Sequence, residues 1–236
     1  MCKISIIIPT LNEASTIKDL LGYLCKNSSS KNIADIIVVD GGSEDDTVSV
    51  VEKTITKTTQ NIILLSSKKG RAKQMNSGAA HATGAILYFL HADSYPPQNF
   101  DQYIIDEVQR GNLAGCFRMC FDSKHWWLRL ASWLTQFSWR ACRGGDQSQF
   151  ITKKLFEEIG GFDESFIIYE DNDLINKLYA KKQFVVINKK LKTSARLYER
   201  VGIWKLQYHF WTIYVKKWLG ATPDDLYHYY LRNIKK

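Results

Sequence analysis

The sequence has no apolar run long enough to cross a bilayer, since none approaches the roughly 18 residues that a transmembrane helix requires. It also lacks the features of a signal peptide. The N-terminus passes directly into Lys3–Pro9, a strand-like segment ended by proline, without a long apolar region or a small-residue cleavage site. We therefore expect a cytoplasmic protein and leave open peripheral contact with the inner face of the membrane.

Cysteine is scarce, and no Cys-x-x-Cys pair indicates a zinc site. The five cysteines are odd in number and scattered along the chain. Cys116 and Cys120 alternate with large apolar residues, as small core residues of a strand do. We expect reduced, mostly buried thiols.

Several common functional motifs are also absent. The chain has no G-x-x-x-x-G-K phosphate loop, no G-x-S-x-G nucleophile elbow and no reactive-cysteine signature. Its net charge of +8 comes from lysines spread along the chain, and no compact basic block marks a nucleic-acid groove. Phosphorylated small molecules and acidic membranes remain as anionic partners. With these motifs excluded, the remaining option is catalysis by acids, bases and a divalent metal ion. Such catalysis fits the transfer of a group to a hydroxyl in a single displacement.

Strands and helices alternate through the first half of the chain. With 236 residues, of which 45% are hydrophobic, the chain can bury a substantial core. Three helices are expected: one that begins at about Ser15, one that includes Val48 and Val51, and one that begins at about Arg71. They separate four apolar strands, Lys3–Pro9, Ile36–Val39, Ile62–Leu65 and Ile86–Leu90. This order predicts an α/β fold with a mostly parallel sheet flanked by helices.

The second half departs from this alternation. Gly115–Phe121 alternates like an edge or antiparallel strand, and Glu170–Lys181 has helical spacing. Phe184–Ile187 is expected to be a short strand, and Ser194-Ala195-Arg196 to end another extended segment. The tail is expected to form two helices, about Ile203–Leu219 and Pro223–Ile234.

Two apolar strands each end in a carboxylate. Asp40 follows Ile36–Val39, and Asp93 closes His91-Ala92-Asp93 after Ile86–Leu90. Ligands of open α/β sheets bind at the carboxyl ends of the strands, although aspartates also commonly cap loops. Mg²⁺ or Mn²⁺ held by one carboxylate and two substrate phosphates would need little more from the protein.

Two further groups of charged residues lie at helix starts. Lys68, Lys69, Arg71 and Lys73 can favour a phosphate there, or can form an ordinary exposed basic helix start. Glu170 and Asp171 can compensate a helix dipole. Because they follow the apolar Phe166–Ile168, they can also be partly desolvated and act as general bases.

The same residues resemble family 2 glycosyltransferases of the GT-A fold, over roughly residues 3–200. Within that family the chain looks most like a small, soluble bacterial subgroup without transmembrane helices. The matching motifs come in the expected order: Ser5–Glu13, Val38–Thr47, Arg71–Gly78, Leu90–Ser94, Gly145–Gln147, Gly160–Phe162, Glu170–Asp171 and Thr193–Arg196.

The resemblance implies an inverting transferase that takes one sugar from a nucleotide donor, with UDP the expected nucleotide. Asp171 would be the catalytic base, and Asp93, aided by His91, would meet Mn²⁺ or Mg²⁺ and the diphosphate. The nucleotide would be lined by Pro9, Leu11, Glu13, Asp40, Arg71, Asn76 and Asp93. The donor sugar and the acceptor would be bordered by Gly145, Asp146, Gln147 and Glu170.

The resemblance also implies a division of the chain. Residues 1–200 would form the catalytic domain, with a nucleotide-binding half of about 1–95 and an acceptor-side half of about 96–200. Residues 201–236 would form a helical C-terminal extension. A nucleotidyltransferase and a catalytically silent nucleotide-sugar-binding or membrane-interaction protein stay open as alternatives.

Two departures from the family pattern bear on this interpretation. His91 stands where the first acid of Asp-x-Asp is expected, which weakens the metal assignment. The Gln-x-x-Arg-Trp motif of processive synthases is absent, and Arg196–Arg200 occupies that region. We therefore do not expect polymerisation through a membrane channel.

The tail carries an aromatic stripe at helical spacing, formed by Trp204, Tyr208, Trp211, Val215 and Trp218. Three lysines lie among these residues, at positions 205, 216 and 217. Such a stripe suits a membrane interface or a lipid-linked acceptor. Packing on the catalytic domain or in a homodimer is slightly favoured, because aromatic stripes are most often core.

Overall fold

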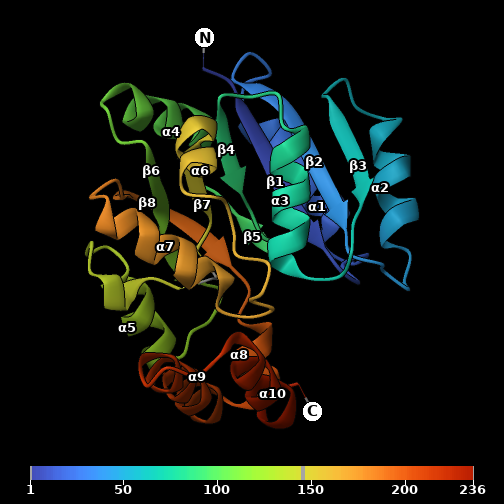
Figure 1. Cartoon of the computed structure of the whole chain (residues 1–236). Coiled ribbons are helices and arrows are strands. Elements are labelled where there is room, and N and C mark those ends of the chain that lie inside the picture. The colour runs from blue at the N-terminus through green and yellow to red at the C-terminus, as the bar shows by residue number, and fades with distance from the viewer. Residues whose placement is uncertain (1, 145–146, 236) are drawn as a thin grey trace.

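The computed structural model describes residues 2–144 and 147–235. Its centre is an eight-stranded sheet in the order β3-β2-β1-β4-β7-β6-β8-β5 (Figure 1). The strands are β1 (Ile4–Thr10), β2 (Ile33–Asp40), β3 (Ile62–Ser66), β4 (Ile86–Phe89), β5 (Ser94–Tyr95), β6 (Ala114–Phe121), β7 (Gln149–Thr152) and β8 (Val185–Thr193).

Six of these strands run in one direction. β1 to β4 are mutually parallel, β7 is antiparallel to both β4 and β6, and β8 is parallel to β6. The short β5 is antiparallel to β8. The carboxyl ends of β1, β2, β4 and β8 therefore lie along the same edge of the sheet, which confirms the predicted α/β class with a mostly parallel sheet.

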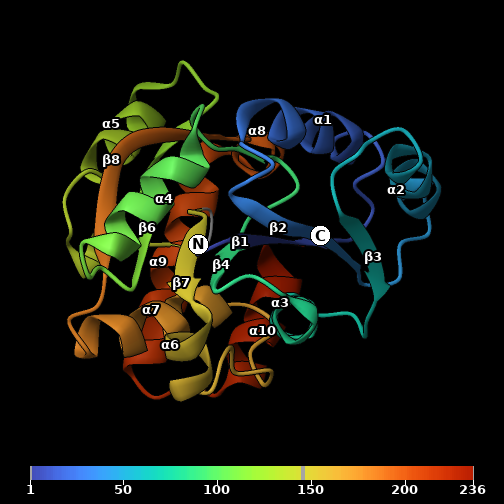
Figure 2. The same ribbon diagram turned by 90° about the horizontal axis from the view of Figure 1, so that it is seen from above.

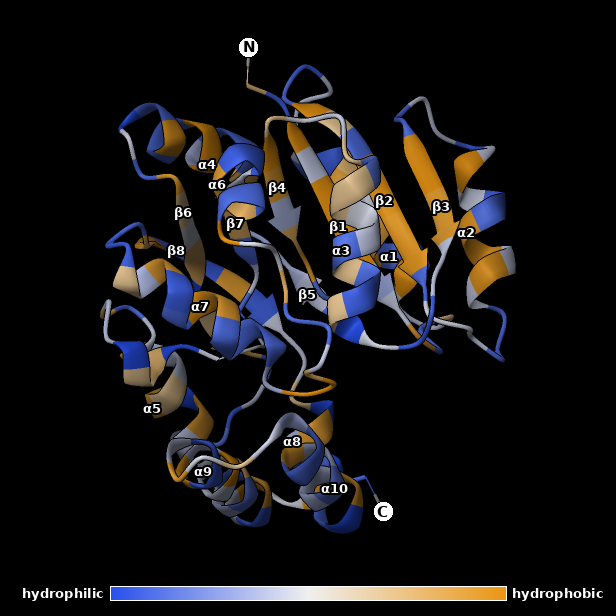
Figure 3. Cartoon of the chain, viewed as in Figure 1, coloured by the Kyte–Doolittle hydropathy of each residue, from blue (hydrophilic) through white to orange (hydrophobic). Residues whose placement is uncertain are grey.

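Helices cover both faces of the sheet (Figure 2). One face packs against α1 (Ile17–Asn27), α2 (Thr47–Ile55) and α4 (Phe100–Gln109). The opposite face packs against α3 (Arg71–His81), α6 (Lys153–Glu158) and α7 (Glu170–Ala180). Because both faces are covered, the central strands are hydrophobic along their length (Figure 3).

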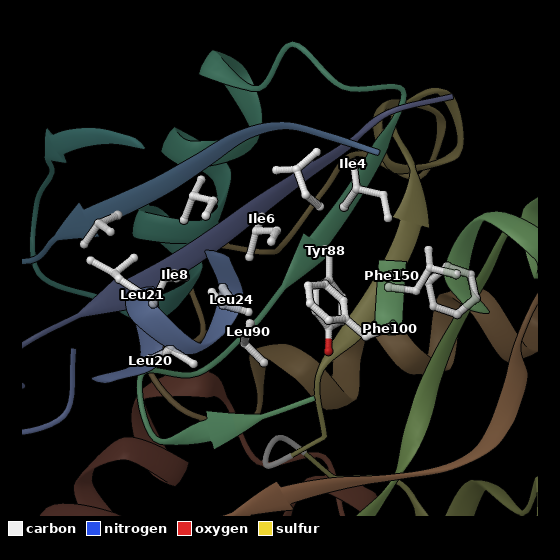
Figure 4. Packing of buried hydrophobic residues seen from close by; sticks show 14 of the residues in the cluster. Ile4, Ile6, Ile8, Leu20, Leu21, Leu24, Tyr88, Leu90, Phe100 and Phe150 are labelled. Carbon is white, nitrogen blue, oxygen red and sulfur yellow. The ribbon is translucent and has the colours of Figure 1, made fainter. Parts of the chain in front are cut away.

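Alternation along β1 divides its side chains between the two layers. Ile4, Ile6 and Ile8 pack against Leu20, Leu21 and Leu24 of α1 (Figure 4). Ile7 points to the other face and contacts α3. Farther along the first face, Tyr88 stacks on Phe100 with ring centroids 5.6 Å apart.

The remaining helices gather at the end of the molecule toward which β4 points (Figure 1). They are α5 (Trp126–Leu134), the short 3-10 helix η1 (Arg140–Cys142), α8 (Arg196–Val201), α9 (Ile203–Trp218) and α10 (Pro223–Asn233). A third apolar cluster joins α5, α8, α9 and α10 to Met119 and Phe121 of β6. No helix within the described residues is both long and apolar enough to cross a membrane.

Several expectations about the second half were wrong. β6 is not an edge strand, because it lies between β7 and β8, although its expected antiparallel pairing is found with β7. β8 continues past Ile187 to Thr193, with a shift of its register against β6 after Ile187 and with its lysines at exposed positions. Arg196 begins α8 rather than ending an extended segment, and its N–H donates to the Ser194 hydroxyl over 3.1 Å.

Burial of the thiols and of the aromatic stripe also differs from expectation. All five cysteines are free, but only Cys116 is fully buried, while Cys2 is exposed. The stripe on α9 is exposed, because Leu206 and Ile213 on the opposite side of the helix make its packing contacts. The favoured prediction of packing therefore holds only in part: Trp204 contacts Trp126 and Trp127 of α5 and Trp211 contacts Trp127, while the stripe stays at least half exposed. Packing in a homodimer remains a prediction.

Candidate active site

Loops from four parallel strands meet at the carboxyl edge of the sheet. Asp40 ends β2, where its carboxylate accepts the N–H groups of Gly42 (2.9 Å) and Ser43 (3.0 Å) and the Ser43 hydroxyl. Its side chain therefore fixes the turn that begins at the end of the strand, as aspartates at such positions do. Contact of Asp40 with a nucleotide remains a prediction.

The loop after β1 is tied to the loop after β2. The Glu13 N–H donates to the Thr47 hydroxyl over 2.8 Å, and the Ala14 N–H donates to Asp45 over 3.2 Å. A hydrogen bond from the Thr47 side chain lowers the pKa of Asp45. Half-buried Leu11 lies in the first of these loops, so its predicted place beside a nucleotide depends on this pairing.

Arg196 joins the loops after β1 and β4. Its Nη2 lies 3.0 Å from Asp93 Oδ2 and 3.2 Å from Glu13 Oε2. The guanidinium is half exposed, whereas the two carboxylates are only 27% and 22% exposed. Three charged groups from separate strand ends thus face one another, and a diphosphate could reach the exposed guanidinium.

A second arginine faces the other two candidate acids. Arg71 Nη1 lies 3.1 Å from Glu170 Oε1 and 3.5 Å from Asp171 Oδ2. Glu170 and Asp171, 2% and 6% exposed, begin α7. Arg71 begins α3, so the starts of two helices on the same sheet face bring these charges together. The prediction that both acids are desolvated is confirmed.

A narrow hollow, too small to hold a water molecule, lies between the catalytic candidate and the sheet edge. Asp171 lines it together with the predicted site residues Pro9, His91 and Gln147. Met75, Phe89, Leu90 and Gln149 complete its lining. A single hollow therefore brings together a buried carboxylate, an imidazole and amide groups.

Gln147 is held in this hollow by a buried arginine. Arg143 Nη1 donates to Gln147 Oε1 over 2.9 Å, and its Nη2 donates to the Thr135 and Phe137 carbonyls. Burial raises the pKa of the neighbouring Cys116 thiol. The predicted sugar-side residues Gly145 and Asp146 lie outside the described residues.

Asn76 is engaged with the loop that precedes α7. Its amide nitrogen donates to the Phe162 carbonyl (2.9 Å) and to Glu164 (3.0 Å), and its oxygen accepts the Phe162 N–H (3.1 Å). Its observed partners are thus loop atoms on the approach to Asp171. Its predicted contact with a nucleotide remains a prediction.

Sequence reasoning missed two residues that hold the site together, Arg143 and Gln74. Gln74 is buried on α3, and its amide nitrogen donates to the carbonyls of Thr10 (2.7 Å) and Val39 (2.8 Å). It thereby joins the ends of β1 and β2. A polar residue beside the buried Ala72 and Met75 was the available signal in the sequence.

The residues that could hold a metal are few. No group of three or more His, Cys, Asp or Glu suited to a metal occurs within residues 2–144 and 147–235. Asp93 supplies a carboxylate and His91 an imidazole two residues earlier. Carboxylates and imidazoles are both known ligands of divalent ions, and a metal held by these two residues remains a prediction.

Solved structures similar to this one include two glycosyltransferases. S. aureus TarS 1–349 in complex with UDP has a TM-score of 0.65 at 19% identity, covering 82% of this chain and 60% of that one. Mannosyltransferase PcManGT from Pyrobaculum calidifontis, in complex with GDP-Man and Mn²⁺, has a TM-score of 0.65 at 21% identity, covering 90% and 60%. These similarities support the predicted fold class.

Among curated proteins, the chain is 26% identical over 197 residues to "Probable glycosyltransferase YdaM" of Bacillus subtilis (strain 168). The match covers 75% of this chain but 46% of that protein. The chain is also 33% identical over 96 residues to TarS of Staphylococcus aureus (strain Mu50 / ATCC 700699), covering 40% of this chain and 17% of TarS. It thus spans less than half the length of these two relatives.

The model of the glycosyl transferase family 2 matches residues 5–167. That range begins in β1 and includes Glu13, Asp40 and Asp93, with the loops that their side chains hold. It ends four residues before Asp171, so the match does not include this residue, and its catalytic role remains a prediction. Because the match covers well over half of the sequence, the chain belongs to glycosyl transferase family 2.

Proposed function

We propose that the protein is an inverting glycosyltransferase that moves a single sugar from a nucleoside diphosphate donor to a hydroxyl acceptor. The observation that carries the proposal is the position of Asp171, a buried carboxylate that lines one narrow hollow with His91 and Gln147. Structures of relatives with UDP, UDP-GlcNAc or GDP-Man support a donor of this class, with UDP the expected nucleotide here.

The proposed step is a single displacement. The acceptor oxygen attacks the anomeric carbon, the bond from that carbon to the diphosphate oxygen breaks, and the nucleoside diphosphate leaves with the electron pair. Asp171 accepts the proton of the acceptor hydroxyl as the new bond forms. Arg71, 3.5 Å from Asp171, orients this carboxylate, and Glu170 holds Arg71 in place.

Donor binding falls to the loops at the carboxyl edge. Pro9, Leu11, Glu13 and Asp40 would border the nucleotide, while Gln147 and Glu170 would border the donor sugar and the acceptor. Lys68, Lys69 and Lys73 stand beside the start of α3, where the helix dipole also favours anions. In this proposal, residues 1–200 form the catalytic domain and residues 201–236 the helical extension.

Asp93 and His91 would hold Mn²⁺ or Mg²⁺ together with the diphosphate. When bound, the ion would neutralise negative charge on the leaving group. The two arginines of the site face four carboxylates, so negative charge is in excess among these six side chains. This excess favours a divalent cation beside the donor and disfavours an unaccompanied diphosphate.

A panel of nucleotide sugars tests the proposal. The purified protein is incubated with each donor and Mn²⁺, and free nucleoside diphosphate, pyrophosphate and bound donor are measured separately. Release of nucleoside diphosphate with free or transferred sugar is expected from at least one donor. Pyrophosphate release would identify a nucleotidyltransferase, and binding without turnover would identify a silent binding protein; either result would overturn the proposal.

A further inference from the structure

Tryptophan is concentrated on one exposed part of the molecule. On α9, Trp204, Tyr208, Trp211, Val215 and Trp218 recur every three or four residues, so they share one side of the helix. Trp126 of α5 joins them, with its ring centroid 5.8 Å from that of Trp204. We call these six residues the aromatic face; each is between 51% and 85% exposed.

The aromatic face is packed only in part, because Trp204 contacts Trp126 and Trp127 of α5 and Trp211 contacts Trp127, while each of the six side chains stays at least half exposed. Leu206 and Ile213, on the opposite side of α9, already fill the third apolar cluster. Trp127 beneath the face lies 5.2 Å from Trp204, and its ring nitrogen donates to Gln207 over 3.2 Å. Trp127, fixed by this hydrogen bond, therefore supports the exposed rings above it. An exposed apolar patch of this kind marks an interaction surface.

Cations predominate along α5 and α9, whereas acids occur on the adjoining helices, as Glu199 on α8 and as Asp224 and Asp225 at the start of α10. Residues 123–144, which contain α5, and residues 203–223, which contain α9, include no aspartate or glutamate. The same two segments carry six cations outside the buried core, Lys124, Arg129, Arg140, Lys205, Lys216 and Lys217. Aromatic residues bordered by cations of this kind match an anionic bilayer surface, where rings enter the headgroup region and cations attract acidic lipids.

A basic pocket adjoins the face. It has a volume of about 300 Å³ and lies between α8, α9 and α10. Arg200, Lys205 and Arg232 line it, and none of its lining residues is acidic. Lys205 follows Trp204 directly, so the pocket and the aromatic face share an edge. Three cations around one hollow suit a phosphate, which is the charged group of an anionic phospholipid.

A second copy of this chain fits the face poorly. A symmetric dimer would place the same surface against itself and would bring the cations of both copies, which outnumber the nearby acids, into one contact. An anionic bilayer supplies both the missing negative charge and an apolar phase for the rings. We propose that α8, α9 and α10, with the start of α5, dock on an anionic membrane, and that the basic pocket binds a lipid phosphate.

Docking would bring the candidate active site close to the bilayer. Tyr214 of α9 donates to Asn172 over 3.4 Å, one residue after Asp171, and its ring lies 5.6 Å from that of Tyr169. Lys217 stands 4.7 Å from the ring centroid of Phe166. This consequence rests on the proposed function, whereas docking itself does not require it.

Flotation with lipid vesicles tests the docking. Wild-type protein is mixed with phosphatidylglycerol vesicles or with phosphatidylcholine vesicles, at about 0.1 M and about 1 M salt, because the Debye length falls from about 10 to about 3 Å over that range. We expect binding to the anionic vesicles at low salt, loss of binding at high salt, and a blue shift of tryptophan emission on binding. Absence of binding at low salt would overturn the proposal.

Matched variants test the aromatic face and the basic pocket separately, and a control variant measures the effect of the protein's overall positive charge. Trp211→Glu/Trp218→Glu and Arg200→Gln/Arg232→Gln should each weaken vesicle binding at least tenfold. Lys53→Gln/Lys57→Gln removes the same charge as the arginine pair from exposed positions at α2 and should bind like wild type. Circular dichroism checks that every variant is folded. Equal losses in both charge variants would contradict a specific site.

Two further measurements distinguish other occupants. Sedimentation should show a monomer; a dimer abolished by Trp211→Glu/Trp218→Glu would assign the face to a second copy. Calorimetric titration with inorganic phosphate tests a soluble ligand. Phosphate binding that needs Arg200 and Arg232, combined with no vesicle binding, would assign the pocket to a free anion and end the membrane proposal. Sugar release is measured separately, because loss of transferase activity would leave both the vesicle and the phosphate results unchanged.

Discussion

At the scale of single residues, Arg196 binds a carboxylate that a metal ion would also need as a ligand. Its guanidinium contacts Asp93, the carboxylate that we assign to a divalent ion, and Glu13. Removing this positive charge should tighten Mn²⁺ binding by up to about fivefold, because a partly exposed ion pair such as Arg196–Asp93 contributes at most about 1 kcal/mol. Electron paramagnetic resonance of free Mn²⁺ measures the affinity of Arg196→Ala and wild type.

The neighbouring exposed arginine of α8 provides the control for this experiment. Arg200→Ala removes the same charge from the basic pocket and should leave Mn²⁺ affinity unchanged. The double variant Asp93→Ala/Arg196→Ala should lose the tighter Mn²⁺ binding that is expected of Arg196→Ala alone. Unchanged affinity in Arg196→Ala would show that the ion and the arginine do not compete for Asp93.

The loop between β2 and α2 contains a carboxylate, Asp45, whose pKa shift has a defined direction. A hydrogen bond from Thr47 lowers the pKa of Asp45 below its ordinary value of 3.8. The ionised carboxylate therefore stabilises the folded loop above that value, and this contribution disappears as the pH falls through the lowered pKa. Thr47→Val should raise the pKa of Asp45 toward 3.8, as followed by NMR. Thr56→Val, at the other end of α2, should not change it.

At the scale of elements, α3 lies unusually close to the sheet. A Cβ on Gly78 would lie 2.5 Å from Ile7 Cγ2 and 3.1 Å from Val39 Cγ2, whereas nothing lies within 4 Å of a Cβ on Gly22 in α1. Gly78→Ala should lower the free energy of unfolding by about 1–3 kcal/mol through overpacking. Gly22→Ala should raise it by about 0.5–1 kcal/mol. Urea denaturation compares them, and equal effects would contradict this packing.

Element prediction succeeded where burial repeats regularly. β1 to β4 are continuous apolar runs, and α1 to α3 carry apolar stripes. The spacing of apolar residues alone therefore identified which of these segments are strands and which are helices. β5 has two residues and offers no period to detect. β8 was shortened to Phe184–Ile187 because Lys189, Lys190 and Lys192 interrupt its apolar run at exposed positions.

At the scale of the whole molecule, the sequence predicted where the charged residues of the site lie along the sheet but not which of them pair with each other. Strand ends could be recognised, so Asp40 and Asp93 were placed at the correct edge. Which arginine faces which acid depends on the order of strands across the sheet, and Arg196 meets Glu13 from 183 residues away. Burial of Arg143 beside Gln147 likewise depends on the packing of α5 and β6, which no local pattern encodes.

The central claim is that Asp171 takes the proton from the acceptor. Single-turnover transfer with a donor found by the nucleotide-sugar panel tests it most directly, together with calorimetric donor binding. Asp173→Asn, two residues along the same helix start and paired with Lys177 at 3.0 Å, is the matched control. We predict that Asp171→Asn retains donor affinity but transfers roughly 10²- to 10⁴-fold more slowly, while Asp173→Asn stays near wild type. Near-wild-type transfer by Asp171→Asn would contradict the account.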